Sequence, residues 1–276
     1  MKKTLGLVLI LILALAPGPV FAQKLDESRI KEQIRKVLKE HPELIWKVLA
    51  EDKGALFDLV TQGNDLRRRQ QWAKKLTARM NKPLKPKLTS GRIMVGGAEA
   101  PFTVVAYSDF LCSACVQGIQ TLMQLMKKHP KQLRVHLKHH PSSQLARQLA
   151  LYYEAAARMD PYKAWRLAEL AFARSSELSR RGLEAMQEIV QELGLDPESL
   201  SRHMADPALN QIIEEDIAEA KGFKLYGKPS YVFNGVPITG AVPMEAFEEL
   251  MRMWKERAAK AEVSKEQPNP KSKPAP

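Results

Sequence analysis

Cysteine is nearly absent from this chain, and its scarcity limits what the protein can be. Only Cys112 and Cys115 occur among the 276 residues, so neither can form a disulfide within the chain except with the other. No cysteine lies in the segment directly after the apolar N-terminal run, residues 5–16, which argues against a lipoprotein anchor. That run is also shorter than the roughly 20 residues that a membrane span needs, which argues against an uncleaved anchor. Internal repeats are absent as well, so a repeat architecture is excluded.

The N-terminus has the pattern of an export signal. Lys2 and Lys3 supply positive charge, an apolar run follows, residues 17–19 break it with proline and glycine, and small residues precede a cleavage position at Ala22. We therefore expect a signal peptide over residues 1–22, cleavage after Ala22 and a mature protein in the periplasm. Disulfide chemistry is possible in such an oxidising bacterial compartment.

Basic residues outnumber acidic ones, and the full chain has a formal net charge of +12. An exported protein rarely meets nucleic acid, so we interpret this charge as a source of solubility and of weak attraction to anionic membrane surfaces. The densest basic stretch, residues 67–75, reads RRRQQWAKK and is typical of the solvated face of a helix. We predict no nucleic-acid partner.

Residues 23–81 have the apolar periodicity of helices but few large apolar side chains. One helix is expected over residues 30–38, a second begins at Pro42, and a third starts near Leu56. This N-terminal helical arm has too little apolar surface for a core of its own, so we expect it to pack on another surface. A second copy of the arm is a candidate, which would make the protein a homo-oligomer. The next segment, residues 82–91, is expected to be an extended linker because prolines alternate with lysines.

Residues 92–262 are expected to form the main domain, of class α/β. The pattern at its start is strand, helix, strand, and such a unit pairs two parallel strands through a right-handed crossover. Helices follow over about residues 142–221, and a hairpin then turns at Asn234-Gly235, a strong signal for a type I′ turn. The hairpin should extend the parallel pair into a mixed sheet with helices on both faces. The expected elements are strands at 102–107 and 132–140, a helix from Ser113, hairpin strands within 230–240, a last helix over 243–261 and a disordered tail over 263–276.

Three roles are open to a cysteine pair with the spacing of Cys112 and Cys115. As a structural disulfide, the pair would close a loop of four residues, worth about 2 kcal/mol by the chain-entropy expression, against about 4.7 kcal/mol for a loop of 100 residues. A structural zinc site needs four ligands, of which two thiolates supply half. Of the nearby histidines, His139 and His140 point to opposite faces of the expected strand, which makes them a poor pair of further ligands. Two chains could still pool four thiolates.

Thiol–disulfide exchange is the role that the spacing favours. Cys112 is expected at the start of a helix, where its sulfur would face unpaired backbone N–H groups and the positive end of the helix dipole. Both favour the thiolate, which is the nucleophilic form and the better leaving group. Cys115 would follow on the same side of the first turn and more deeply buried. The pair would then consist of an exposed sulfur that attacks and a shielded sulfur that resolves the mixed disulfide.

Three stretches taken in order, YSDFLCSAC, GKPSYVFNG and GAVPMEAF, resemble the DsbA-like family of thioredoxin-fold thiol–disulfide oxidoreductases. The resemblance covers most of the chain after residue 22 and implies a thioredoxin-like fold, βαβ–ββα, with an inserted helical domain. The earlier stretch VLKEHPELIWKVL is similar to the N-terminal helical segment of the suppressor-of-copper-sensitivity type, whose members use such segments to oligomerise. The resemblance therefore also implies that residues 23–81 are an arm for self-association.

The resemblance further implies a cis-proline opposite the cysteine pair, and Pro229 occupies that position. The backbone of Lys228 would then lie beside Cys112 and hydrogen-bond an extended substrate strand. Many relatives have threonine or valine before this proline, so Lys228 is a departure. Its charge would favour the thiolate on Cys112 or select acidic substrates, unless the side chain extends into solvent.

Other residues around the cysteine pair are expected to affect its redox potential and its proton transfer. Ser113 and Ala114 separate the cysteines and lack the histidine that helps to make some members strongly oxidising, which favours a milder potential. Ala106 lies where some members carry a buried glutamate for proton transfer, so that role is empty here or is filled from elsewhere. Asp109 either caps the helix or raises the pKa of the cysteine, and capping is the simpler role.

Together these residues predict an exported oxidoreductase that exchanges disulfides with cysteine-bearing protein substrates, with Cys112 as nucleophile and Cys115 as resolving residue. Pro229 and Lys228 would bind the substrate. The cysteine pair itself would carry the electrons, without a metal or other cofactor, and a membrane redox partner would recharge it. The dipeptide between the cysteines and the expected oligomer favour an isomerase or reductase, whereas the DsbA-like resemblance favours an oxidase. The alternative is a non-catalytic oligomeric binding or chaperone-like protein, for example one that handles copper.

Overall fold

The computed structural model describes residues 27–89 and 91–266. The expected signal peptide, residues 1–22, lies outside these ranges, as does most of the expected C-terminal tail. The chain divides into two compact units, residues 1–69 and residues 70–276. Within the described ranges, no helix combines the length and the apolar character that crossing a membrane requires.

The first unit consists of helices, as the apolar periodicity predicts. Helix α1 spans Glu27–Glu40, α2 spans Pro42–Glu51, and α3 spans Lys53–Met80 and so runs past the end of the unit. Proline is favoured in the first turn of a helix because the N–H it lacks would have no partner there. Pro42 takes this position and marks the start of α2.

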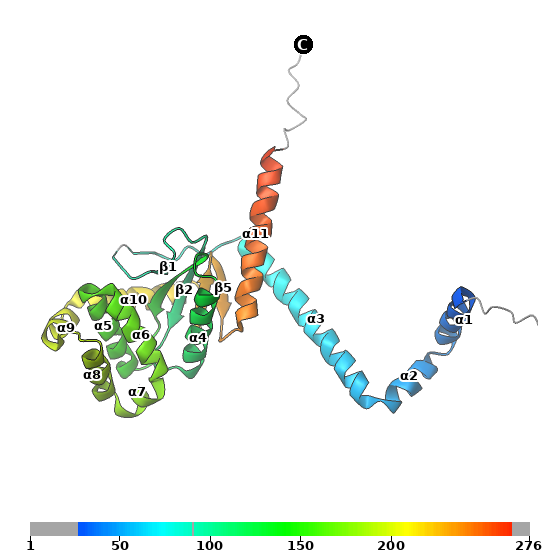
Figure 1. The fold of residues 1–276 in the computed structure, drawn as a ribbon, viewed down its shortest axis with the longest axis horizontal. Helices are drawn as coiled ribbons and strands as arrows, with labels where there is room; N and C mark the ends of the chain where they lie inside the picture. Colours follow the sequence, from blue (N-terminus) through cyan, green and yellow to red (C-terminus); the bar gives the residue numbers. More distant parts are fainter. Residues whose placement is uncertain (1–26, 90, 267–276) are drawn as a thin grey trace, which may run out of the picture. The chain divides into compact units, whose positions relative to one another are not determined.

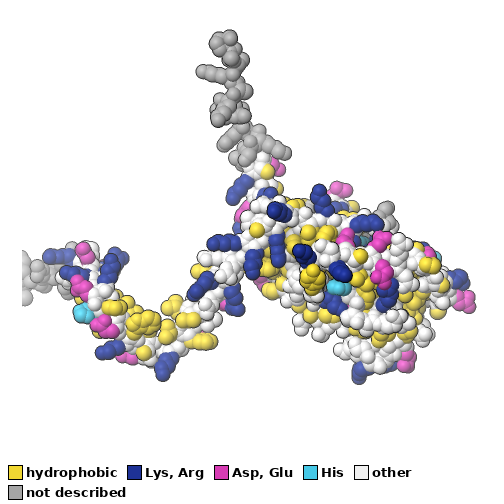
Figure 2. All heavy atoms as spheres, turned by 180° about the vertical axis from the view of Figure 1, so that it is seen from behind, with side chains coloured by type: hydrophobic (Ala, Val, Ile, Leu, Met, Phe, Trp, Pro, Cys, Tyr) yellow, Lys and Arg dark blue, Asp and Glu magenta, His cyan; other side chains and the backbone are white. Residues whose placement is uncertain are grey.

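Large apolar side chains lie exposed along this first unit (Figure 2). No residue of α1 or α2 is buried, and the side chains of Trp46 and Phe57 are 67% and 69% exposed. An exposed apolar surface of this extent is a common sign of an interaction site. The residues that form it are Ile34, Val37, Leu38, Leu44, Ile45, Trp46, Val48, Phe57, Leu59, Val60 and Leu66.

The division between the units falls within α3, earlier than the arm boundary expected at residue 81. Leu76 and Met80, about one turn apart near the end of α3, are buried in the hydrophobic core of the second unit. Between them, Arg79 Nη1 donates a hydrogen bond to the Pro237 carbonyl at 2.6 Å. The last part of α3 therefore belongs to the second unit, and the arm is shorter than its helical pattern suggests.

A five-stranded mixed sheet lies at the centre of the second unit (Figure 1). Its strands are β1 (Val95–Gly96), β2 (Phe102–Ser108), β3 (Leu133–His139), β4 (Ser230–Phe233) and β5 (Val236–Thr239). They lie in the order β1-β3-β2-β4-β5. Strands β2 and β3 are parallel and are joined by α4 (Ser113–Lys128), whereas the other neighbouring pairs are antiparallel. The predicted thioredoxin-like arrangement, βαβ–ββα in a mixed sheet, is confirmed.

Strand β1 is the part of the sheet that the sequence pattern does not predict. It contains two residues, too few for an alternating apolar pattern. Gly96 has φ +117°, and a Cβ atom there would lie 2.2 Å from the Leu133 carbonyl oxygen. Only glycine permits this close approach of β1 to β3.

The insertion between β3 and β4 is helical, as predicted for about residues 142–221. It contains α5 (Gln144–Met159), α6 (Pro161–Ala173), α7 (Ser175–Arg181), α8 (Leu183–Glu192), α9 (Pro197–Met204) and α10 (Pro207–Gly222). Asp160, Asp196 and Asp206 each precede a proline, and each side chain accepts a backbone N–H of the helix that follows. These caps explain why α6, α9 and α10 begin where they do.

The last helix, α11 (Met244–Glu266), is longer than expected. Residues 263–266 belong to it, which corrects the prediction that the tail is disordered from residue 263 onward. Neither proline nor glycine interrupts the sequence between residue 244 and Pro268, so nothing local ends the helix earlier.

Alternate residues of β2 face opposite sides of the sheet. Val104 and Ala106 pack in the large core, which includes side chains of α4 and α11, whereas Val105 and Tyr107 pack in a smaller cluster with α10. Helices therefore cover both faces of the sheet, as the sequence predicts.

Residues 82–91, expected to be an extended linker, are held by hydrogen bonds to other residues of the second unit. The Leu84 N–H donates a hydrogen bond to the Gly235 carbonyl at 2.8 Å. Asn234 and Gly235 have φ angles of +43° and +85°, as the predicted hairpin turn requires. A Cβ on Gly235 would lie 2.4 Å from Pro83 Cβ, so this glycine also makes room for the segment.

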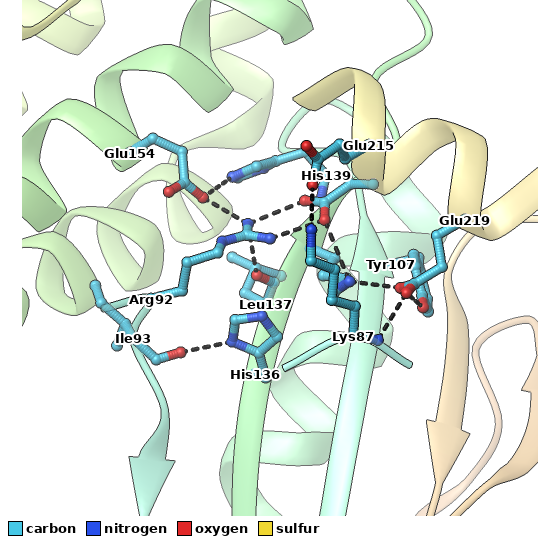
Figure 3. Close-up of polar contacts among 12 residues, drawn as sticks. Lys87, Arg92, Ile93, Tyr107, His136, Leu137, His139, Glu154, Glu215 and Glu219 are labelled. Carbon is cyan, nitrogen blue, oxygen red and sulfur yellow. Dashed lines mark hydrogen bonds and ion pairs between the residues drawn. The ribbon is translucent and has the colours of Figure 1, made fainter. Parts of the chain in front are cut away.

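Buried charges join the helical insertion to the sheet (Figure 3). Arg92 donates to both carboxylate oxygens of Asp216 in α10, at 2.8 and 2.9 Å, and to Glu154 Oε1 in α5 at 2.6 Å. His139 Nε2, at the end of β3, lies 2.8 Å from the same Glu154 oxygen, and its backbone N–H donates to Asp216 at 2.9 Å. All four side chains are almost fully buried, so each charge depends on the others to compensate for lost hydration.

The same network continues through Lys138, whose Nζ donates to Glu219 and lies 3.5 Å from Asp216 Oδ1. Burial acts to raise the pKa of the Glu154 carboxyl, but the hydrogen bond from His139 and the charge of Arg92 outweigh it and lower that pKa to about 2. Glu154 is therefore a charged group in the interior, and it ties α5 to the end of β3.

Candidate active site

Cys112 lies at the N-terminus of α4, directly after the loop that leaves β2. It is the N-cap residue, with an extended backbone, and its Sγ accepts a hydrogen bond from the Cys115 N–H at 3.4 Å. Its side chain is half-buried, whereas Cys115 is fully buried on the next turn. The predicted placement, an accessible first sulfur and a shielded second sulfur at a helix start, is confirmed.

The thiol of Cys115 is held in its neutral form. Burial raises its pKa to about 12, and the neighbouring Cys112 sulfur adds to the rise. The Ser108 hydroxyl at the end of β2 opposes the rise, although no hydrogen bond of normal geometry joins the two groups. A thiolate on Cys115 therefore needs stabilisation from its surroundings.

Asp109 connects three segments beneath the cysteine loop. Its Oδ2 accepts hydrogen bonds from Lys228 Nζ at 2.8 Å and from the Ser142 N–H and Oγ at 2.9 and 2.6 Å, and its Oδ1 accepts from the Leu111 N–H. Burial acts to raise the pKa of this carboxyl, but the bonds from Lys228 and Ser142 outweigh it and hold the pKa below its ordinary value.

These contacts correct the expected capping role of Asp109 and exclude one of the two alternatives for Lys228. Asp109 does not cap α4, because Cys112 takes that position and the Asp109 side chain stabilises the preceding loop instead. Lys228 does not extend into solvent, because its ammonium group is paired with Asp109. A cation that is paired with a carboxylate exerts a weaker field on other groups than a free cation does. The charge of Lys228 therefore acts mainly on Asp109.

The peptide bond between Lys228 and Pro229 is cis, as predicted. Pro229 precedes β4 and lies close to α4, since a Cβ atom on Gly118 would lie 2.8 Å from Pro229 Cγ. Of the two residues between the cysteines, Ser113 is exposed and Ala114 is half-buried on the first turn of α4. The structure thus places the predicted residues on the cysteine loop, the start of α4 and the proline loop that packs against α4.

The histidines of β3 and its end lie in different surroundings. His139 is buried and bonded to Glu154, whereas His140 is half-buried and its N–H donates to the Ser108 carbonyl at 2.8 Å. Burial lowers the pKa of His140, and the charge of Lys228 lowers it further. Within residues 27–89 and 91–266, no three or more His, Cys, Asp or Glu side chains are grouped so that they could hold a metal ion.

Sequence reasoning did not identify Ser108, Ser142 or Tyr231 as neighbours of the site. Ser108 and Tyr231 lie within the quoted motifs, one directly before Asp109 and the other two residues after Pro229, but neither was given a role. The alternation of strand residues could have placed Tyr231 on the α4 face of the sheet. No sequence pattern points to Ser142, because its contact with Asp109 depends on the path of the chain after β3.

Comparison with known proteins bears on the fold of this chain. The family model of the DSBA-like thioredoxin domain matches residues 138–252, which include Lys228 and Pro229 but begin after the cysteine pair. Two curated relatives are sodium/proton antiporters. The chain is 28% identical over 178 residues to NhaA of Herminiimonas arsenicoxydans, covering 62% of this chain and 27% of that protein. It is 31% identical over 157 residues to NhaA 3 of Salinispora tropica, covering 55% and 23%. The chain thus spans about a quarter of the length of these relatives.

Solved structures share the fold of the second unit at low sequence identity. A thioredoxin-like oxidoreductase from Silicibacter pomeroyi has a TM-score of 0.55 and 20% identity, over 61% of this chain and 94% of that one. Oxidised BdbD from Bacillus subtilis has a TM-score of 0.55 and 17% identity, over 62% and 96%. The catalytic domain of Proteus mirabilis ScsC has a TM-score of 0.54 and 13% identity, over 65% and 96%. The protein therefore has the thioredoxin-like fold of DsbA-like thiol–disulfide exchange proteins, and its residues 138–252 match the DSBA-like thioredoxin domain family.

Proposed function

We propose that this protein is an exported thiol–disulfide oxidoreductase that acts on proteins through Cys112 and Cys115. The observation that carries the proposal is the contrast between the two sulfurs: one caps α4 and is half-exposed, and the other is buried one turn further on. Exchange needs this pairing of an accessible attacker with a resolver that solvent thiols cannot reach. The cis-proline loop beside α4 and the similarity in fold to DsbA-like proteins agree with it.

The reaction in the oxidising direction proceeds in two displacements. A substrate thiolate attacks Cys112 Sγ, the Cys112–Cys115 bond breaks, and its electron pair passes to Cys115 Sγ, which takes up a proton. A second substrate thiolate then attacks the substrate sulfur of the mixed disulfide and releases Cys112. Two electrons pass from the substrate to the pair, and the reverse sequence reduces a substrate disulfide. The negative sulfur on Cys112 would be stabilised by the Cys115 N–H and the dipole of α4.

In this proposal the loop of Lys228 and Pro229 binds the substrate backbone. Lys228 is partly exposed and Pro229 is buried directly before β4. Pairing of an extended peptide with backbone groups next to a strand is a recurrent mode of recognition. The pairing of Lys228 with Asp109 fixes that loop relative to the cysteine loop. Ser113 and Ala114 lie on the first turn between the sulfurs and tune the potential of the pair. The cysteine pair itself carries the electrons, with no other cofactor. A membrane protein that faces the periplasm would then return the pair to its original redox state.

The test is to trap the mixed disulfide. With glutathione disulfide as the probe, the Cys115→Ser variant should accumulate close to one glutathione per chain on Cys112, because the resolving sulfur is missing. In the wild-type protein, Cys115 should displace glutathione and form the Cys112–Cys115 disulfide. The Cys112→Ser variant should form no glutathione adduct in the same time. Intact-mass measurement after acid quenching distinguishes these species. Absence of an adduct on Cys115→Ser would contradict the proposal and favour a non-catalytic binding protein.

We also propose that a second copy of this chain covers the apolar surface of the first unit. Eleven large apolar side chains are exposed there, and identical arms can bury them symmetrically. Light scattering of the full protein should give a mass that is a multiple of one chain. Substituting aspartate for Trp46 or Phe57 should shift the mass to that of a single chain, whereas Tyr226→Asp, which changes an exposed side chain of the second unit, should not. A wild-type protein that is strictly monomeric rules out this role for the arm.

A further inference from the structure

Tyr231 carries a buried hydroxyl that has no hydrogen-bond partner among the described residues. The side chain is 0% exposed, and its oxygen forms no hydrogen bond with any residue in the part of the chain that the structure describes. Leaving a buried polar group unpaired is unfavourable, and a phenylalanine would fill the same space without that cost. Such groups are rare in folded proteins, and those that occur call for an explanation such as a role in catalysis.

The ring of Tyr231 is held rigidly beside α4. Tyr231 lies opposite Ala106 in the antiparallel pairing of β4 with β2, on the face of the sheet that α4 covers. Its ring packs edge-on against Phe247 of α11, with the ring centroids 5.2 Å apart. The hydroxyl therefore points in a direction that is set by the surrounding packing.

That direction is toward the turn of α4 that follows the cysteine pair. A Cβ atom on Gly118 would lie 1.9 Å from the Tyr231 hydroxyl oxygen, so glycine alone permits the hydroxyl to lie there. Gly118 lies three residues after Cys115, and residues three apart share one side of a helix. The hydroxyl thus lies against the side of α4 that carries Cys115, which is itself fully buried.

The electrostatics agree with this geometry. Burial raises the pKa of the Tyr231 phenol, and negative charge on Cys115 and then on Cys112 raises it further. A phenol with a raised pKa keeps its proton, so it can donate a hydrogen bond but does not act as an acid. Burial also raises the pKa of Cys115, to about 12, and the Ser108 hydroxyl and the Asp109 backbone N–H offset only part of that rise, so a further donor would stabilise its thiolate.

We infer that the Tyr231 hydroxyl is a positioning group that donates a hydrogen bond to Cys115 Sγ while that sulfur carries negative charge. The inference rests on the proposed exchange function. In the resolving step, Cys115 gives its proton to solvent, its thiolate attacks Cys112 Sγ of a mixed disulfide, and the bond to the substrate sulfur breaks with release of the substrate thiolate. Tyr231 would increase the population of the attacking thiolate and keep its own proton throughout.

Tyr231→Phe tests the inference because it removes only the oxygen and preserves the contact with Phe247. The reduced protein is mixed with glutathione disulfide, quenched with acid at intervals and analysed by intact mass. The first step, attack of Cys112 on the probe, should keep its wild-type rate. The second step, closure by Cys115 with release of glutathione, should slow by about tenfold, as expected for loss of a hydrogen bond to a charged group. Tyr162→Phe, which removes an exposed hydroxyl in α6, should change neither step.

Each outcome of this experiment bears on the inference. A second step at the wild-type rate in Tyr231→Phe would overturn it, and so would an equal slowing of both steps, because that pattern indicates a structural role. If the wild-type protein forms no mixed disulfide at all, the proposed function fails first and the inference fails with it. The first step also serves as an internal measure of folding, since it requires an intact site in the same sample.

Discussion

Replacing Arg92 with leucine is expected to lower the free energy of unfolding by about 3–5 kcal/mol. The guanidinium group bonds two buried carboxylates, those of Asp216 and Glu154, and its side chain is only 7% exposed. Without it, the remaining partners, His139 for Glu154 and Lys138 for Asp216, would compensate the two buried charges only in part. Denaturant unfolding of the full protein, followed by circular dichroism, measures the difference. Arg92→Lys should recover only part of it, because an ammonium group cannot form the two parallel bonds to Asp216.

Arg252→Leu in α11 is the matched control for this prediction. Arg252 also bonds two carboxylates, those of Glu249 and Glu256, but its side chain is 55% exposed. Exposed pairs of this kind contribute little, so the loss should remain below about 1 kcal/mol. If the two leucine variants lose equal stability, the burial of the Arg92 network has no special energetic role.

The acid response of the Arg92 variant separates charge from packing. The pKa of Glu154 is about 2 in the folded protein and near 4.5 when unperturbed, so its ionised form stabilises the fold above about pH 4.5. That contribution is lost as the pH falls from 4.5 toward 2. In Arg92→Leu one of the groups that lower this pKa is gone, so the loss of stability on acidification should be smaller than in the wild type. An unchanged acid profile would indicate that the variant acts through lost packing alone.

Gly118→Ala is expected to destabilise the protein by about 1–2 kcal/mol net, because forcing an extra methyl into a packed interior costs about 2–3 kcal/mol and the helix preference of alanine offsets part of it. The new Cβ would lie 1.9 Å from the Tyr231 hydroxyl oxygen and 2.8 Å from Pro229 Cγ. Alanine is a better helix former than glycine by about 1 kcal/mol, so a net loss of stability requires the clash to outweigh that gain. The same denaturant measurement shows which of the two effects is larger.

The double variant of Gly118→Ala with Tyr231→Phe identifies the source of the clash. Removing the hydroxyl relieves the shortest contact, so the pair should be more stable than the sum of the single variants predicts, by about 1 kcal/mol or more. Gly63→Ala in α3 is the control, because apart from the nearby backbone of α3 no atom of the described residues lies within 4 Å of its new Cβ. That variant should be neutral or slightly stabilised. Strict additivity in the double variant would mean that the hydroxyl is not what excludes a side chain at residue 118.

The elements that short-range patterns encode could be predicted from the sequence. Strand β2 and helix α4 follow from an apolar run and a helical period, and the hairpin follows from Asn234-Gly235, because turn chemistry is local. The placement of the cysteine pair at the start of a helix could be predicted for the same reason, since the spacing and the helix start lie within ten residues. The cis-proline was predicted from family resemblance, which carries information that local patterns lack.

The remaining features depend on contacts between distant parts of the chain. The partner of Lys228 is Asp109, more than a hundred residues earlier, and no local pattern pairs them. Arg92, Glu154 and Asp216 read individually as ordinary charged residues, and only the folded chain brings them together in the interior. The end of the arm was misjudged because α3 continues unbroken across the boundary between the units, so helical periodicity could not reveal the change.

Because Cys115 is buried, the reduced protein has one cysteine that bulky thiol reagents can reach. The chain has no cysteine besides these two, and only Cys112 is accessible from solvent. A fluorophore or spin label that reacts with thiols can therefore be attached at one known position without engineering the sequence. The label would sit at the N-terminus of α4, near the loop of Pro229, and its spectrum would report on anything that approaches this surface.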